Sequence, residues 1–116
     1  ITVHYKLSAR STGIVGGADI AQMKPTAYLI NTSRGPLIDE QAMIAAIRDG
    51  RIAGAGLDVF DDEPLPRDHF FRTSPHVVVT PHVGYVSREN YMTYYRETVE
   101  NIEGWLAGKP VRLIQA

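Results

Sequence analysis

Four short apolar segments alternate with helix-like segments along this chain of 116 residues, and this alternation restricts the possible folds most strongly. The apolar segments are rich in Ile, Val, Leu or Tyr and are bounded by Gly, Pro or polar residues, as strands are. The last three are continuous apolar runs, which favours a parallel sheet with both faces covered. The four are ITVHY (1–5), AYLIN (27–31), IAGAGLDVF (52–60) and HVVVT (76–80).

Two shorter segments between these runs carry the start and stop signals of helices. Residues 17–23 form the first, and Pro25 prevents it from continuing. The second spans residues 39–50, where Asp39 is a good N-cap and Gly50 suits the position just after the last turn. Both connect successive strands, as crossover helices of a parallel sheet do.

A third and longer helix is predicted over residues 87–110, with Ser87 as its N-cap. Apolar residues recur at helical spacing along it, which predicts a packed face. These residues are Tyr91, Tyr95, Val99, Ile102 and Leu106. Residues 61–75 contain no such pattern and are predicted to be a long loop, a kind of segment that is often functional. The order of elements therefore predicts an α/β fold.

Composition narrows the possible partners. The formal net charge is −1, which gives no excess of positive charge to attract nucleic acid or an anionic membrane surface. The chain has no cysteine, and His69 beside Asp68 is not a spacing typical of a metal site, so we expect no metal. No apolar run approaches the roughly 18 residues that span a bilayer. These features favour a cytoplasmic protein.

Polar residues follow the predicted strands at one common edge. The carboxyl ends of parallel strands lie together, and ligands of open α/β sheets bind there. The second strand is followed by Thr32-Ser33-Arg34-Gly35. Asp58 lies at the end of the third and Glu63 follows it, and Thr80-Pro81-His82-Val83-Gly84 comes at the end of the fourth. An anion clamp, an acid or base and its orienting carboxylate could be built from these residues.

Three of these segments resemble consecutive signatures of the D-isomer-specific 2-hydroxyacid dehydrogenases. They are LINTSRGPLIDE (29–40), AGAGLDVFDDEPLP (53–66) and VVVTPHVGY (77–85). The resemblance implies a Rossmann-like parallel sheet with helices on both faces, the second half of a doubly wound dinucleotide-binding domain. Residues 1–108 would be the C-terminal portion of that domain, carrying the catalytic residues. Residues 109–116 would be a tail that returns to a substrate domain outside this chain.

The resemblance also implies a role for each residue at the common edge. Arg34 would hold the substrate carboxylate and polarise its carbonyl, and His82 would be the acid and base as well as a neighbour of the cofactor. Glu63 would hydrogen-bond to the far ring nitrogen of His82, which fixes the tautomer and stabilises the imidazolium. Asp58 would accept a hydrogen bond from the nicotinamide carboxamide.

The remaining implied contacts belong to the cofactor, which is NAD or NADP. Backbone groups near Thr32, Ser33 and Gly84 would flank the nicotinamide. The Gly-x-Gly-x-x-Gly turn that cradles the pyrophosphate does not occur in this chain, and GIVGG (13–17) does not match its spacing. Lys6 stands where the family usually has proline, and it could reach a phosphate or be a solvated lysine.

The implied function is transfer of a hydride between NAD(P)H and C2 of a small 2-keto or 2-hydroxy acid, with D-specificity. The enzyme is expected to be a homodimer, and the 116-residue chain alone is expected to be inactive. Two alternatives stay open. One is a nucleotide-sensing binding protein or corepressor of the same fold. The other is a truncated product that does not catalyse a reaction.

Overall fold

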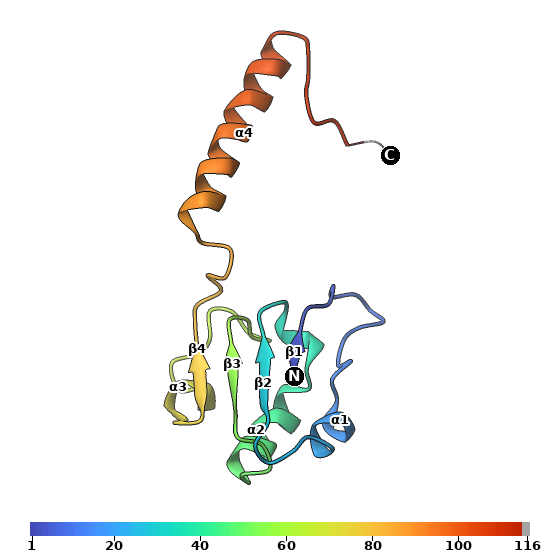
Figure 1. The fold of residues 1–116 in the computed structure, drawn as a ribbon, viewed down its shortest axis with the longest axis vertical. Helices are drawn as coiled ribbons and strands as arrows, with labels where there is room; N and C mark the ends of the chain where they lie inside the picture. Colours follow the sequence, from blue (N-terminus) through green and yellow to red (C-terminus); the bar gives the residue numbers. More distant parts are fainter. Residues whose placement is uncertain (115–116) are drawn as a thin grey trace. The chain divides into compact units, whose positions relative to one another are not determined.

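The computed structural model describes residues 1–114, which form two compact units that divide after Val83 (Figure 1). The described part of the first unit holds a four-stranded sheet with the spatial order β1-β2-β3-β4. Every neighbouring pair of strands is parallel, so the predicted parallel α/β fold is confirmed. The strands are β1 (Thr2–Val3), β2 (Tyr28–Asn31), β3 (Gly54–Leu57) and β4 (Val77–Val79).

The four strands end level with one another. Val3 pairs with Asn31, Asn31 with Leu57, and Leu57 with Val79, so the last residues of all strands form one row. The segments that leave this row therefore start from neighbouring points about 5 Å apart. This row is the edge at which the sequence predicts the functional residues.

The core lies on one face of the sheet. Leu29 is fully buried, whereas Tyr28, the preceding residue of β2, is 58% exposed. On the buried face, α2 (Glu40–Arg48) contributes Met43 and Ile47, which are 3% exposed each. Cover on both faces was expected from the continuous apolar runs. Within the described residues of the first unit, only one face is covered, and Val78 of β4 is also exposed on the other.

Both shorter helices form where they are predicted. The first is α1 (Gly17–Ala21). At the start of α2, the Asp39 side chain accepts a hydrogen bond of 2.9 Å from the Ala42 N–H, which confirms the predicted cap. Gly50 follows the helix with φ +64°, a conformation that favours glycine.

The segment predicted as a loop over residues 61–75 contains a short helix, α3 (Phe70–Thr73). His69 caps it by accepting from the Phe71 N–H, and its Nε2 lies 3.2 Å from a carboxylate oxygen of Glu40 on α2. The Arg72 guanidinium donates to the carbonyl of Leu65 within the same segment. The segment is therefore folded against the core, and the interpretation of it as irregular throughout is wrong.

The second unit contains α4 (Arg88–Leu106), which Ser87 caps by accepting from the Asn90 N–H. The predicted packed face is wrong for the described chain, because α4 buries no residue. Tyr95 and Leu106, for example, are 67% and 71% exposed. Among the described residues, no helix is long and apolar enough to cross a membrane.

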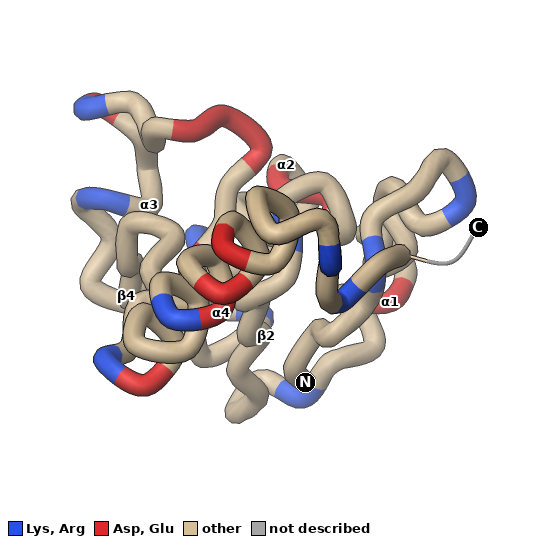
Figure 2. Tube along the Cα trace, turned by 90° about the horizontal axis from the view of Figure 1, so that it is seen from above, with Lys and Arg blue, Asp and Glu red and all other residues tan. Residues whose placement is uncertain are grey.

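Charge is distributed along the chain without a long basic stretch. Figure 2 shows short blue segments of Lys and Arg interspersed with red segments of Asp and Glu. The longest acidic run in the sequence is Asp61-Asp62-Glu63, in the segment between β3 and α3. Within this run, Glu63 hydrogen-bonds to the Phe60 N–H and to the His82 ring, and it belongs to the site described below.

Candidate active site

The turn after β2 holds Arg34 in a defined place. Asn31, the last residue of β2, is 2% exposed. Its Nδ2 donates to the carbonyl of Arg34 over 2.8 Å, and its Oδ1 accepts from the Ser33 N–H over 3.0 Å. The Ser33 hydroxyl also donates to the carbonyl of Val3 on β1. Asn31 was not recognised as a site residue from the sequence, although a polar residue that ends an apolar strand is a usable signal.

Gly35 brings this turn against the segment that follows β3. A Cβ atom at position 35 would lie 2.1 Å from the carbonyl carbon and oxygen of Phe60 and 2.5 Å from the nitrogen of Asp61. No such atom fits, so glycine is required for close approach of two backbones. Gly35 therefore allows the Arg34 turn to contact the segment that follows a different strand, β3.

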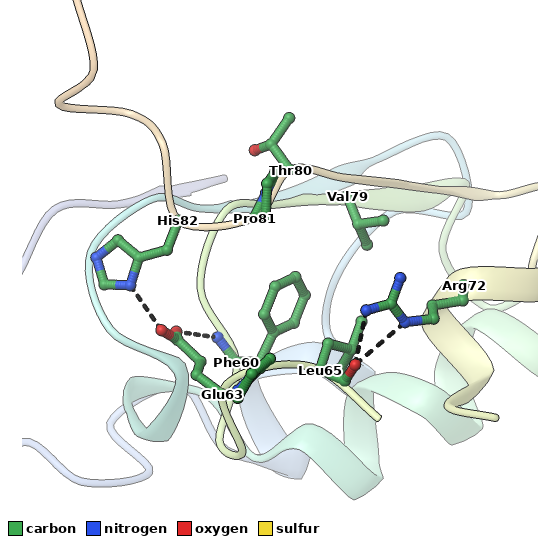
Figure 3. Close-up of a pocket in the computed structure, with 9 residues that line it drawn as sticks. Phe60, Glu63, Leu65, Arg72, Val79, Thr80, Pro81 and His82 are labelled. Carbon is green, nitrogen blue, oxygen red and sulfur yellow. Dashed lines mark hydrogen bonds and ion pairs between the residues drawn. The ribbon is translucent and has the colours of Figure 1, made fainter. Parts of the chain in front are cut away.

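Glu63 and His82 form a hydrogen-bonded pair (Figure 3). The Oε2 atom of Glu63 lies 2.7 Å from Nδ1 of His82, and its Oε1 atom accepts from the Phe60 N–H over 2.9 Å. Both side chains are about one-third exposed, at 35% and 37%. An ionised carboxylate only accepts, so Nδ1 carries the proton in this pair and Nε2 lies on the opposite side of the ring.

Arg34 acts electrostatically on the same pair. Burial by itself raises the pKa of Glu63, but hydrogen bonds from His82 and the Phe60 N–H lower it, as do the charges of His82 and Arg34. The net effect places this pKa below the ordinary value for glutamate. The structure therefore brings together Arg34, Glu63 and His82, three residues that are far apart in the sequence.

Asp58 fixes the backbone turn that carries His82. Its Oδ1 atom accepts from the Thr80 hydroxyl over 2.5 Å and from the Val83 N–H over 2.9 Å. His82 itself has φ +56°, a left-handed conformation that is uncommon outside glycine, and its N–H donates to the carbonyl of Thr80. Asp58 is 4% exposed. These hydrogen bonds to residues on both sides of His82 hold its backbone in the strained conformation.

Thr80 is the second residue that sequence reasoning did not single out. Its hydroxyl and the Val83 N–H both donate to the Oδ1 atom of Asp58. A hydroxyl residue two positions before a functional histidine is too common a pattern to mark a role. Only the spatial neighbourhood of Asp58 reveals it.

A pocket of about 260 Å³ opens beside the pair of Glu63 and His82 (Figure 3). Its walls are mainly apolar and come from the β3–α3 segment and from β4 and the turn after it. The lining residues are Phe60, Glu63, Pro64, Leu65, Arg72, Val79, Thr80, Pro81 and His82. Apolar walls with a few convergent polar groups are typical of small-molecule sites.

A second pocket of about 470 Å³ lies at the other end of the strand row, after β1 and β2. It includes Ser33 and Arg34 from the β2 turn, and Lys6 from the segment after β1. Thr32 belongs to the same β2 turn, whereas Gly84 is the first residue of the second unit.

The residues present suit a nicotinamide dinucleotide. Asp58 is a carboxylate that accepts N–H and O–H donors at the strand row, which is the property that a carboxamide requires. Lys6 and Arg34 supply positive charge in the second pocket, which is the property that a phosphate requires. Among the described residues, no group of three His, Asp or Glu side chains could hold a metal ion.

Comparison with known proteins places these features in one family. Residues 1–84 match the family described as D-isomer specific 2-hydroxyacid dehydrogenase, NAD binding domain. A curated relative is the glyoxylate/hydroxypyruvate reductase B of Enterobacter agglomerans, which is 44% identical over 109 residues. That match covers 94% of this chain but 34% of the relative, so the chain spans about a third of the length of that protein.

Solved structures show the same similarity. The D-lactate dehydrogenase with NAD+ from Lactobacillus jensenii has a TM-score of 0.85 and 28% identity, covering 99% of this chain and 38% of that one. The D-isomer specific 2-hydroxyacid dehydrogenase from Xanthobacter autotrophicus Py2, in complex with NADPH and MES, has a TM-score of 0.75 and 39% identity. That match covers 96% of this chain and 45% of the other. The match over residues 1–84, supported by these structures, shows that the chain belongs to the NAD-binding domain of the D-isomer specific 2-hydroxyacid dehydrogenase family.

Proposed function

We propose that this chain carries the catalytic part of an NAD(P)-dependent oxidoreductase that interconverts a 2-keto acid and the D-form of the corresponding 2-hydroxy acid. The nicotinamide, when bound, supplies or accepts the hydride. The chain's own residues bind the acid, orient it and move the proton. Arg34, Glu63 and His82 are the catalytic and positioning residues of this proposal.

Arg34 would hold the substrate carboxylate. A guanidinium presents a planar fork of N–H donors that matches the two oxygens of a carboxylate. Its backbone is fixed by Asn31 and by the close contact of Gly35 with Phe60. The same positive charge would polarise the adjacent carbonyl.

His82 would donate a proton from Nε2 to the carbonyl oxygen as C2 of the substrate accepts the hydride. In the reverse direction, Nε2 would take the hydroxyl proton as C2 loses the hydride. Glu63 would act through His82. Its hydrogen bond keeps a proton on Nδ1 and orients the ring so that Nε2 faces away from the carboxylate. Glu63 is thus a positioning residue.

Cofactor contacts complete the proposal. Asp58 would accept from the nicotinamide carboxamide in addition to holding the His82 turn. Backbone groups of Thr32, Ser33 and Gly84 would flank the ring. The domain limits proposed are residues 1–108 for the dinucleotide-binding portion and 109–116 for a tail toward a substrate domain.

The observation that carries the proposal is the 2.7 Å pair of Glu63 and His82 within the electrostatic reach of Arg34. The test uses the complete gene product that contains this chain, called the full-length protein below. Reduction of glyoxylate, hydroxypyruvate and pyruvate is followed by nicotinamide absorbance with NADH and NADPH. Turnover of at least one acid is expected, with the D-product where the product is chiral. Binding of the dinucleotide without turnover of any acid would favour a sensor or corepressor.

Arg34→Met and Arg67→Met provide a matched pair in that assay. Both remove an exposed guanidinium, but Arg67 lies in the segment before α3 and lines neither pocket. Arg34→Met is expected to reduce kcat/KM by about 10³-fold, and Arg67→Met far less. Equal losses would contradict the assignment of the substrate clamp to Arg34.

A homodimer and a cytoplasmic location are also part of the proposal. Exposed apolar side chains on α4 support association, since Tyr95, Ile102 and Leu106 are all more than half exposed. Sedimentation velocity of the full-length protein measures its oligomeric state. A monomer at micromolar concentration would contradict the homodimer.

Fractionation of cells that express the full-length protein tests the cytoplasmic location. Recovery in the membrane or secreted fraction would contradict that location.

A further inference from the structure

The pocket after β1 and β2 carries positive charge that the proposed chemistry does not fully use. Its lining residues are His4, Tyr5, Lys6, Leu7, Ser33 and Arg34. Two of these are cations and none is a carboxylate, although the chain as a whole has a net charge of −1. Arg34 is assigned to the substrate, which leaves Lys6 without a role.

The ammonium group of Lys6 makes no hydrogen bond or ion pair with any of the residues that the structure describes. Its side chain is exposed within the pocket wall. Other cations of the chain do find partners. Arg112, for example, pairs with Glu97 and Glu100 in the second unit.

The backbone that carries Lys6 is nonetheless fixed. The hydroxyl of Ser11 donates to the carbonyl of Lys6 over 2.7 Å and accepts from the Ser8 N–H over 2.7 Å. Ser11 is 1% exposed, and Leu7 packs against the core. A firmly held backbone with an unpaired cation at its tip suits a site for an anion that arrives from solution.

The order of the strands indicates which anion binds at Lys6. His82 follows β4, at one edge of the sheet, and Lys6 follows β1, at the opposite edge. A dinucleotide lies across the carboxyl ends of the strands in this fold. With the nicotinamide at the His82 end, its phosphate-bearing part extends toward β1.

We propose that Lys6 binds a phosphate group of the dinucleotide in the pocket that it shares with Arg34. This inference rests on the proposed function and adds a determinant of cofactor affinity from this chain's own sequence. The phosphate is either the 2′-phosphate that only NADP carries or the pyrophosphate common to NAD and NADP. Both sources present the same chemistry, a charged oxygen cluster that a lysine contacts as a point charge.

The test measures binding to the full-length protein by the fluorescence enhancement of NADPH and NADH in the absence of substrate. Lys6→Met is compared with Lys24→Met. Lys24 is also exposed but lies in the turn before β2, at the other end of the strands. Lys6→Met is expected to raise the Kd by about tenfold, and Lys24→Met by less than about twofold.

The two cofactors separate the two sources of phosphate. Weaker binding of NADPH alone supports contact with the 2′-phosphate, whereas weaker binding of both supports contact with the pyrophosphate. Lys6→Arg retains the charge and is expected to restore most of the affinity. Added salt should weaken binding by the wild type more than by Lys6→Met, since one ion pair is screened.

Unchanged affinity of Lys6→Met for both cofactors overturns the inference, provided that its Tm equals that of the wild type. If its Tm differs, Lys6→Gln and the salt dependence decide instead, and equal Kd values and salt slopes in the wild type and Lys6→Gln would also overturn it. A wild type that binds neither dinucleotide contradicts the proposed function itself. A wild type that binds and turns over, with Lys6 variants that bind equally well, contradicts only the role of Lys6.

Discussion

At the β4 end of the strand row, polar side chains are bonded to one another, whereas at the β1 end the ammonium group of Lys6 presents an unpaired charge. Asp58 holds the turn on both sides of His82, and Glu63 holds the imidazole itself. The side chain of Lys6, in contrast, is exposed, and its ammonium group has no partner among the described residues. Proton transfer depends on geometry within tenths of an ångström, whereas attraction of an anion depends mainly on charge.

This difference predicts how each end responds to substitution. Changes at Glu63, Thr80 or His82 should affect the rate of the chemical step and leave cofactor affinity nearly intact. Changes at Lys6 should affect cofactor affinity and its salt dependence. Gly35 links the two ends, because it places the Arg34 turn against the backbone of Phe60 and Asp61.

Replacement of His82 should give the largest effect. His82→Gln removes the acid and base, so kcat of the full-length protein should fall by about 10²–10⁴-fold. The Kd for NADPH, measured by fluorescence, should change little. His76→Gln, an exposed histidine at the opposite end of β4, is the control and should retain full activity. Equal activity of wild type and His82→Gln would remove the histidine from the mechanism.

Substitution of Gly35 tests the link between the two ends. Gly35→Ala places a methyl group about where the backbone of Phe60 lies, and neither backbone can yield cheaply. The free energy of unfolding should fall by about 3 kcal/mol, measured by urea denaturation. Gly16→Ala is the control, because a Cβ there would meet only atoms at 3.7 Å or more. A similar stability for both variants would show that the close contact is not retained in solution.

Loss of the Thr80 hydroxyl tests the clamp around His82. Thr80→Val removes the donor to Asp58, which should cost about 2 kcal/mol of stability and lower kcat by about tenfold. KM should stay near that of the wild type, and Thr80→Ser should recover most of kcat. Thr12→Val, far from the His82 turn in sequence, serves as the control. A change confined to stability, with kcat unaltered, would leave Thr80 with a structural role only.

Acid titration of stability should show the smallest effect. The pKa of Glu63 in the folded protein is lower than its ordinary value. The ionised carboxylate therefore stabilises the fold above the ordinary pKa of glutamate, and this contribution is lost as the pH falls through the lower folded pKa.

The comparison for that titration is between wild type and Glu63→Gln. Between about pH 5 and pH 3, the free energy of unfolding should fall more steeply for the wild type. Asp62→Asn removes a carboxylate at the exposed neighbouring position and is the control. If the free energy of unfolding falls equally with pH in the wild type and in Glu63→Gln, the ionised carboxylate does not stabilise the fold.

Much of the fold could be predicted from local patterns. Apolar runs bounded by glycine and proline mark β2, β3 and β4, and Asp39 and Ser87 mark the starts of α2 and α4. The short α3 could not be predicted, because it is stabilised by contacts distant in sequence, such as His69 with Glu40. A helix of four residues has little intrinsic stability of its own.

For α4, the sequence pattern predicted a packed face that the described chain does not contain. Tyr95 and Leu106 have the spacing of a packed face, yet both are exposed in the chain described. Periodicity shows that a helix has an apolar side, but it does not show which surface covers that side.

The sequence suggested the residues of the candidate site but not the hydrogen bonds that hold them. Arg34, Glu63 and His82 were identified through a family resemblance, and their strand ends explain why they meet. Asn31 and Thr80 act through hydrogen bonds that no spacing reveals. The left-handed backbone at His82 is likewise imposed by surrounding bonds rather than by its residue type.

A double-mutant comparison of Glu63 and His82 tests whether the carboxylate acts through the histidine. The kcat of the full-length protein is measured for Glu63→Gln, His82→Gln and the double variant, with a 2-keto acid that the wild type reduces. If Glu63 acts only through His82, the double variant should lose no more activity than His82→Gln alone. If the two losses multiply, the residues act independently, and the account of a carboxylate that positions the acid–base histidine is contradicted.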